Sequence, residues 1–409
     1  MVPEGWKLST IQEIANVSSG GTPSRKNDTY WNGNIPWVTT AEVQFKVIKD
    51  TSEKITEKGL ANSSAKLFPV DTILMAMYGQ GKTRGQVAKL GIEASTNQAC
   101  AAIVLHPDYE VDYYYQFLVS QYENIREMAN SGGQENLSGG IVKSIQVPVP
   151  PLPEQKKIAQ ILSTWDKAIT TTEQLLANSQ QQKKALMQQL LTGKKRLLDK
   201  NGVRFSGEWK DVEIGKVLKE VKRPVDWDDD AEYKLLSVKR RSEGVALREV
   251  LKGSNILTKK MNVAHSGDFL ISKMQIVHGA AGLVSDEFDG FHVSDSYISL
   301  IPKDENKLDI HFFAWFAKQK LMYHKAFLCS YGVHIEKMTF NFKLFLKEKI
   351  KLPVSIEEQQ KIASVLSAAD QEVTTLQQQL GQLKQEKKAL MQQLLTGKRR
   401  VKIDDKEVA

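Results

Sequence analysis

The sequence has few cysteines, and nothing in their placement supports a covalent or metal-bound scaffold. Only Cys100 and Cys329 occur among 409 residues, and they lie far apart in the chain. This scarcity excludes a disulfide framework and a CxxC metal site, and it favours a reducing compartment. The seven histidines do not pair at metal-ligand spacing, so no metal site is expected.

Features that direct a chain to a membrane or to secretion are missing as well. No apolar run approaches the roughly 18 residues that span a bilayer. The first residues, Met1 to Trp6, lack the basic and apolar regions of a signal peptide. We therefore expect a cytoplasmic protein that does not bind membranes.

The sequence also contains no complete set of catalytic residues of a known kind. Residues 76–83 fit a relaxed phosphate-loop pattern, in which Lys82 and Thr83 would hold nucleotide phosphates and magnesium. A phosphate loop has to open a helix, and residues 84–91 contain two glycines and make a poor helix. Residues 34–37 match only part of an amino-methyltransferase motif, without its glycine-rich cofactor loop. The sequence therefore predicts a non-catalytic chain with no catalytic residues.

Positive charge is what the chain does have in excess. The formal net charge is +8 and the isoelectric point is about 9.1. Lys and Arg contacts to phosphates supply most non-specific DNA affinity, so this balance favours a polyanionic partner. A generally basic soluble protein is the alternative.

The length of 409 residues exceeds that of one ordinary domain, so we expect more than one domain.

Internal repetition is the strongest signal in the sequence. Residues 183–194 return unchanged at 387–398, and the segment 154–159 returns at 358–363 with one difference. The displacement is 387 − 183 = 204 in one case and 358 − 154 = 204 in the other. The stretches before each copy diverge after a shared opening. The order is therefore variable, constant, variable, constant.

Both constant segments carry apolar residues at alternating spacings of four and three, which is a heptad seam typical of a coiled coil. Lys183 and Lys387 are the one charged position in each seam. A long apolar stripe has to be buried, and the other copy is the simplest partner. We predict an antiparallel pair within one chain; two coiled coils that join different chains are the alternative. The predicted seam comprises Ile158, Leu162, Trp165, Ile169, Leu176, Leu186, Leu190, Ile362, Leu366, Val373, Leu376, Leu380, Leu383, Leu390 and Leu394.

Start and stop signals flank both helices. Ser355 and Glu358 predict a reciprocal capping box, and Pro153 stands near the first helical position of the other copy. Gly193 and Gly397 predict left-handed helix ends. The basic residues that follow each glycine suit the negative end of the helix dipole.

The variable regions predict mixed α and β structure. Residues 71–78 and 99–105 read as buried strands, and residues 112–128 as a tyrosine-rich helix. Basic, aromatic and amide side chains interleave in the loops, where Arg and Lys can reach guanine and phosphates and Asn and Gln can pair with adenine. An ordinary solvated turn is the alternative for any one loop. The candidate DNA-binding residues are Arg25, Lys26, Tyr30, Gln80, Lys82, Thr83, Arg84, Gln134, Asn136, Lys239, Arg240, Arg241, Lys273, Gln275, His278 and His334.

These segments resemble a known family. Residues 148–159 are similar to the opening of the conserved helical region in type I restriction-modification specificity subunits, and residues 186–194 resemble its end. Residues 20–24 and 30–37 are similar to a common beginning of that family's target-recognition domains. The resemblance implies an α+β fold with two globular α/β domains, separated by a pair of long antiparallel coiled-coil helices in a pseudo-twofold internal repeat.

The resemblance also implies domain boundaries and partners. Each target-recognition domain would contact one part of an interrupted DNA site, and two methyltransferase subunits and restriction subunits would dock. No cofactor is expected on this chain; S-adenosylmethionine, ATP and magnesium are expected on the partner subunits. A coiled-coil scaffold that binds only proteins is the competing class. The expected segments are target-recognition domains at 1–150 and 199–353, helical spacers at 151–198 and 354–400, and a tail at 401–409.

The predicted helices would act as a ruler between the two domains. Each seam runs 190 − 158 = 32 residues, or about 48 Å at roughly 1.5 Å per residue. At roughly 3.4 Å per base pair, this length allows at most about 14 base pairs between the centres of two half-sites.

Overall fold

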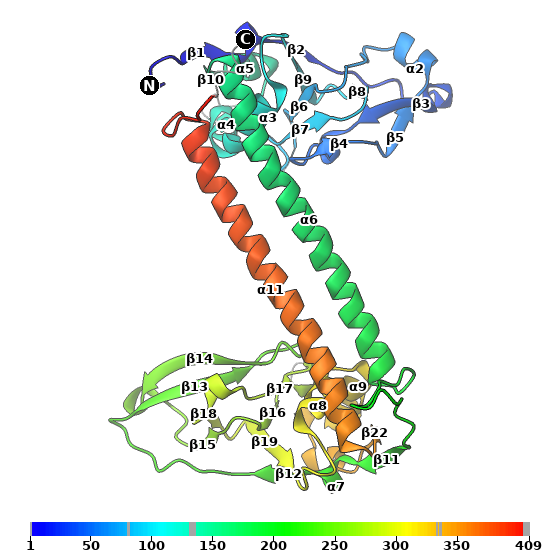
Figure 1. Ribbon diagram of the computed structural model, residues 1–409, viewed down its shortest axis with the longest axis vertical. Coiled ribbons are helices and arrows are strands. Elements are labelled where there is room, and N and C mark those ends of the chain that lie inside the picture. Colours follow the sequence, from blue (N-terminus) through cyan, green and yellow to red (C-terminus); the bar gives the residue numbers. More distant parts are fainter. Residues whose placement is uncertain (1, 80–81, 131–135, 333, 335–337, 404–409) are drawn as a thin grey trace. The chain divides into compact units, whose positions relative to one another are not determined.

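The computed structural model describes residues 2–79, 82–130, 136–332, 334 and 338–403, and Figure 1 labels most of its helices and strands. The chain divides into two compact units. Unit 1 contains residues 1–174 and 377–409, and unit 2 contains residues 175–376. Each unit therefore combines one globular domain with the adjoining halves of two long helices.

The domain of unit 1 is built on two small sheets and a strand pair. The first and last strands, β1 (Lys7–Thr10) and β10 (Gln146–Val149), pair antiparallel. The five-stranded sheet has the order β2 (Ala15–Ser19), β9 (Cys100–Leu105), β6 (Ile73–Ala76), β7 (Val87–Leu90) and β4 (Val47–Ile48). The three-stranded sheet has the order β5 (Glu53–Ile55), β3 (Trp31–Val38) and β8 (Ser95–Thr96). The short helices are α1 (Ile11–Ile14), η1 (Asp28–Tyr30), η2 (Thr40–Glu42), α2 (Glu57–Ala61), α3 (Val111–Ser120), α4 (Tyr122–Asn130) and α5 (Gly139–Ser144).

The domain of unit 2 has a related construction. Its first and last strands, β11 (Trp209–Glu213) and β22 (Lys349–Pro353), again pair antiparallel. One four-stranded sheet has the order β12 (Leu218–Val221), β19 (Tyr297–Pro302), β16 (Phe269–Ser272) and β17 (Ala281–Leu283). The other four-stranded sheet has the order β14 (Val245–Lys252), β13 (Glu232–Val238), β18 (Phe291–Ser294) and β15 (Met261–Ala264). A further pair is formed by β20 (Ser330–Tyr331) and β21 (Thr339–Phe340). The helices are α7 (Ile214–Val217), η3 (Gly253–Asn255), η4 (Ile276–His278), η5 (Asp286–Phe288), α8 (Ile310–Ala317), α9 (Lys320–Leu328) and α10 (Phe342–Phe345).

The two variable regions share the central strand order of their sheets although their sequences diverge. In unit 1, β9 lies between β2 and β6, and β6 pairs with β7; in unit 2, β19 lies between β12 and β16, and β16 pairs with β17. The strand β3 pairs antiparallel with β5 and parallel with β8, just as β13 pairs with β14 and β18. The connections β6–β7 and β16–β17 are therefore equivalent positions in the two domains.

The predicted strands are confirmed, and the predicted helix 112–128 is wrong in one respect. All four residues of β6 are buried, as its continuous apolar run requires. The helical stretch breaks at Gln121, where α3 ends and α4 begins. The Ser120 hydroxyl donates to the Phe117 carbonyl at the last turn of α3. A serine that bonds the backbone in this way competes with helix continuation.

The duplicated segments form the two longest helices, α6 (Leu152–Leu190) and α11 (Ile356–Leu394), each of 39 residues. The left-handed ends predicted at Gly193 and Gly397 are confirmed, with φ of +70° and +71°. The amides of Lys195 and Arg399 then reach back to carbonyls in the last helical turns. No helix among the described residues combines the length and apolar content needed to cross a membrane.

Ion pairs join α6 to α11 in each unit and show that the helices run antiparallel. In unit 1, Lys387 pairs with Asp166 at 2.6 Å and Lys384 with Glu173 at 2.6 Å. In unit 2, Lys183 pairs with Asp370, and the Ser179 hydroxyl donates to Glu372 at 3.0 Å. The single charged position predicted in each seam is thus a lysine that binds an aspartate on the other helix. The predicted antiparallel pair within one chain is confirmed.

Burial along the seam is uneven. Every predicted seam residue is buried or half-buried. The residues near the helix ends belong to the cores of the globular domains: Ile158, Leu162 and Leu394 pack in the core of unit 1. Leu190, Ile362 and Leu366 pack in the core of unit 2. The ends of both helices are therefore integral parts of the domains.

Two buried carboxylates correct our expectations for the helix ends. Arg400 binds Glu154 through two bonds of 2.7 and 2.8 Å, and Arg196 binds Glu358 through two bonds of 2.5 and 2.6 Å. Each arginine therefore serves the first turn of the other helix, rather than only the end of its own. The amide of Glu358 donates to Ser355, but the Glu358 carboxylate is taken by Arg196, so the predicted capping box is half formed.

Candidate nucleic-acid interface

The candidate residues lie on connections that occupy equivalent places in the two domains. Lys82, Thr83 and Arg84 lie between β6 and β7, and Lys273, Gln275 and His278 lie between β16 and β17. Arg25, Lys26 and Tyr30 lie between β2 and β3, while Lys239, Arg240 and Arg241 lie at the turn between β13 and β14. Asn136 and His334 are exposed and follow α4 and α9; Gln80 and Gln134 lie outside the described residues.

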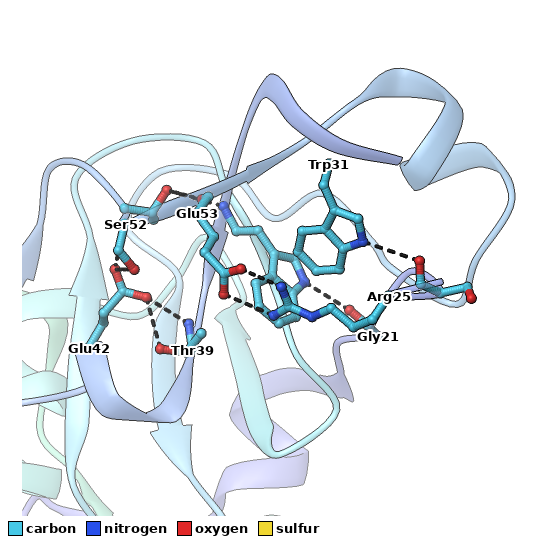
Figure 2. Close-up of polar contacts among 10 residues, drawn as sticks. Gly21, Arg25, Trp31, Thr39, Glu42, Ser52 and Glu53 are labelled. Atoms are coloured by element: carbon cyan, nitrogen blue, oxygen red, sulfur yellow. Dashed lines mark hydrogen bonds and ion pairs between the residues drawn. The ribbon is translucent and has the colours of Figure 1, made fainter. Parts of the chain in front are cut away.

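Arg25 is held by an acidic and an aromatic neighbour. Its guanidinium forms two bonds with Glu53 on β5, one of them 2.9 Å long between Nη2 and Oε2, and it lies 3.7 Å from the centre of the Trp31 ring (Figure 2). Both terminal nitrogens of the guanidinium thus bond within the domain. A base contact by Arg25 would require this pair to open, whereas the exposed Lys26 is under no such constraint from it.

Two indoles fix the connection that carries Arg25. The Trp37 Nε1 donates to the Gly21 carbonyl at 3.0 Å, and the Trp31 Nε1 donates to the Ser24 carbonyl at 3.2 Å. The rings of Trp31 and Trp37 meet edge to face with 5.1 Å between their centres. Two indoles of β3 therefore hold the first part of the β2–β3 connection.

Replacing Glu53 with glutamine is expected to make the melting temperature fall less steeply with decreasing pH below about pH 6. The bonds from Arg25 lower the pKa of Glu53 in the folded protein. They therefore stabilise the fold at pH values above the pKa of Glu53 in the unfolded chain, about 4.3, and this stabilisation is lost as the pH falls through the pKa of Glu53 in the folded protein. The effect is small, because the Arg25 and Glu53 side chains are 54 % and 35 % exposed. Melting temperatures of both proteins between about pH 6 and pH 3 test this; parallel profiles would contradict it.

The loop around Lys82 leads into a strand. Lys82 is exposed, Thr83 and Arg84 are half-buried, and β7 begins at Val87. The part of this loop that the structure describes, residues 82–86, therefore leads into a strand, whereas a phosphate loop opens a helix. Among the described residues, no group of three or more His, Cys, Asp or Glu side chains could hold a metal ion.

The structure brings two of the candidate segments of unit 2 together. The Arg241 amide donates to the His278 carbonyl at 2.7 Å, so the β13–β14 turn lies against the β16–β17 connection. Lys239, Arg240 and Arg241 are exposed at this turn. Lys273 is half-buried, and its ammonium donates to the Asp295 carbonyl at the edge of an open recess of about 390 Å³.

Sequence reasoning missed the residues that hold these loops in place. Glu53 lies 28 positions from Arg25, and the contact between the turn of Arg241 and the connection of His278 joins segments that no local pattern relates. The duplication did carry a usable signal for the helix pair. Glu154, Arg196 and their repeats at Glu358 and Arg400 stand at the same displacement as the helices themselves.

Comparison with protein families gives a match over most of the chain. The type I restriction modification DNA specificity domain matches residues 3–178 and 206–385. The type I restriction enzyme MjaVIII specificity subunit of Methanocaldococcus jannaschii is 25 % identical over 434 residues, which cover 98 % of this chain and 94 % of that protein. The MjaIX specificity subunit of the same organism is 32 % identical over 173 residues, which cover 41 % of this chain and 39 % of that relative.

A solved structure shares the fold. The S subunit of the type I restriction-modification system of M. genitalium matches over 96 % of both chains, with a TM-score of 0.61 and 15 % sequence identity. At this identity the likeness concerns the fold. It agrees with the two-domain α+β architecture predicted from the sequence.

Proposed function

Because this chain belongs to the family of type I restriction-modification DNA specificity subunits, we propose that it reads a bipartite, interrupted DNA site. Each globular domain reads one half-site. The observation that carries this proposal is one central strand order, present in both domains with different loop residues: Lys82 and Arg84 at one connection, Lys273, Gln275 and His278 at its equivalent. Two domains that present different side chains at equivalent connections can recognise two half-sites of different sequence.

The partners follow from the same proposal. The chain itself contributes recognition, and two methyltransferase subunits dock near α6 and α11 and modify adenines with S-adenosylmethionine. Restriction subunits that use ATP and magnesium complete the assembly. The matched ion pairs at both ends of the helix pair support two similar docking environments, because Glu154 and Arg400 are repeated by Glu358 and Arg196.

A binding experiment separates this function from that of a protein-only scaffold. The chain, co-expressed with its methyltransferase subunits, is mixed with duplexes that carry the host's interrupted methylation motif, which methylome sequencing supplies. We expect tight binding to the motif and much weaker binding when either half-site is scrambled. A scaffold that binds no DNA would show equal, weak binding to all duplexes, and that result would reject the proposal.

Lys82→Ala is expected to weaken DNA binding about equally for all sequences. Loss of one phosphate contact should lower the slope of log affinity against log salt by about 0.9. Titrations at several salt concentrations measure the slope, and Lys82→Arg, which keeps the charge, should retain it. Lost ATP affinity with unchanged DNA binding would instead favour the nucleotide-loop reading.

A further inference from the structure

The turn between β13 and β14 in unit 2 is strained. Arg241 and Ser242 are adjacent non-glycine residues with φ of +59° and +56°. A residue with a Cβ adopts this left-handed conformation at an energetic cost, and it persists there only where the surroundings impose it. Some neighbouring group must therefore hold this turn, which carries the exposed Arg240 and Arg241 side chains.

Tyr323 on α9 is the side chain that joins the turn to the next connection. Its hydroxyl is hydrogen-bonded to the Ser242 hydroxyl at 2.5 Å. Its ring lies against Gly279, where an added Cβ would come within 1.8 Å of the ring. The amides of Arg241 and Ser242 donate to the carbonyls of His278 and Gly279 at 2.7 and 2.9 Å. Tyr323 thus contacts both candidate segments at once.

Unit 1 places a tyrosine with the same task on the corresponding helix. The Tyr122 hydroxyl, on α4, donates to the Lys82 carbonyl at 2.5 Å and accepts from Arg126 at 3.2 Å. The ring is held edge to face by Phe45 at 5.1 Å. The β6–β7 connection is therefore tied to α4 through a backbone atom of a candidate contact residue.

We propose that Tyr323 and Tyr122 are positioning residues, each of which sets the loop conformation through which its own unit reads its half-site. This inference rests on the proposed function. Neither hydroxyl has to touch DNA: Tyr323 acts through Arg241 and His278, and Tyr122 acts through the loop of Lys82. Because the two tyrosines belong to different units, their effects on recognition are separable.

The test measures base preference at each half-site separately. The chain with its methyltransferase subunits selects from a duplex library randomised at both half-sites, and the bound fraction is sequenced. Tyr323→Phe is expected to reduce discrimination at one half-site by roughly threefold to tenfold, the range a neutral hydrogen bond contributes, and to leave the other half-site unchanged. Tyr122→Phe should show the reverse pattern.

Further variants isolate the hydrogen bond itself. Ser242→Ala removes the other partner and should reproduce Tyr323→Phe, and the double variant should add little, because both changes delete one contact. Tyr113→Phe is the matched control, since the described residues supply no hydrogen-bond partner for the buried Tyr113 hydroxyl. It should change neither half-site.

The outcomes that overturn the proposal are distinct from those that overturn the function. Equal loss at both half-sites, or a lower melting temperature with the base preference intact, would show that the tyrosines are only structural. A wild-type protein that selects no sequence at all would reject the proposed function and, with it, this inference.

Discussion

Arg400→Met is expected to destabilise unit 1 by about 2 kcal/mol. The Glu154 carboxylate is 3 % exposed, and among the described residues it would keep only the bond from the Trp6 Nε1, at 2.9 Å. Removing one partner of a buried pair typically costs about 3–5 kcal/mol, and we take a lower value because the Arg400 side chain is 45 % exposed. Urea unfolding followed by tryptophan fluorescence measures the change.

The repeat supplies matched variants for this prediction. Arg196→Met removes the equivalent bonds to Glu358, and its cost should be at least as large, because Arg196 is only 19 % exposed. Arg399→Met, at an exposed neighbouring position, should change stability by no more than about 0.5 kcal/mol. Glu154→Gln should recover part of the loss in the Arg400→Met background, since a neutral amide is cheaper to bury. An Arg400→Met protein as stable as the wild type would contradict this account.

Inserting seven residues into both long helices is expected to change the DNA site itself. Seven residues near Leu176 in α6 and Leu376 in α11 preserve the heptad register and add about 10 Å of helix. If the helix pair acts as the ruler, both half-sites stay the same and the gap lengthens by up to about three base pairs. Methylome sequencing of a host that carries the variant reads the half-sites and the gap together.

An insertion in α6 alone is the control. It would shift Asp166 relative to Lys387 or Lys183 relative to Asp370, and two charged groups would lose their partners. We expect little methylation from that variant. If the variant with insertions in both helices methylates a motif with an unchanged gap, the helix pair does not act as the ruler. That result would not affect the assignment of the chain to its family.

The sequence predicted the helix pair well because its information is periodic and duplicated. The helix limits, the glycine ends and the charged seam lysines all follow from local patterns, and the repeat shows that they form one unit. The partners of the buried Glu154 and Glu358 were not predicted. Each carboxylate is bound by an arginine more than 160 positions away, and no local pattern reports such a contact.

The domains were predicted less completely for a related reason. The buried strands β6 and β9 stand out as apolar runs, but the shared central strand order of the two domains is hidden because their sequences diverge. The break at Gln121 has no glycine or proline to mark it. At the candidate interface, composition points to the loops, while only the folded chain shows that Arg25 is held by Glu53 or that Arg241 lies beside His278.

The pairing of the first and last strand of each domain has a consequence for how such chains can vary. Lys7 lies opposite Val149, and Trp209 lies opposite Pro353, so the backbone enters and leaves each domain at neighbouring points. A replacement cassette of different length could therefore be spliced between these points, provided that it keeps the apolar surface that packs on the helix ends. Under the proposed function, exchange of such cassettes would give a new DNA target in a single genetic event.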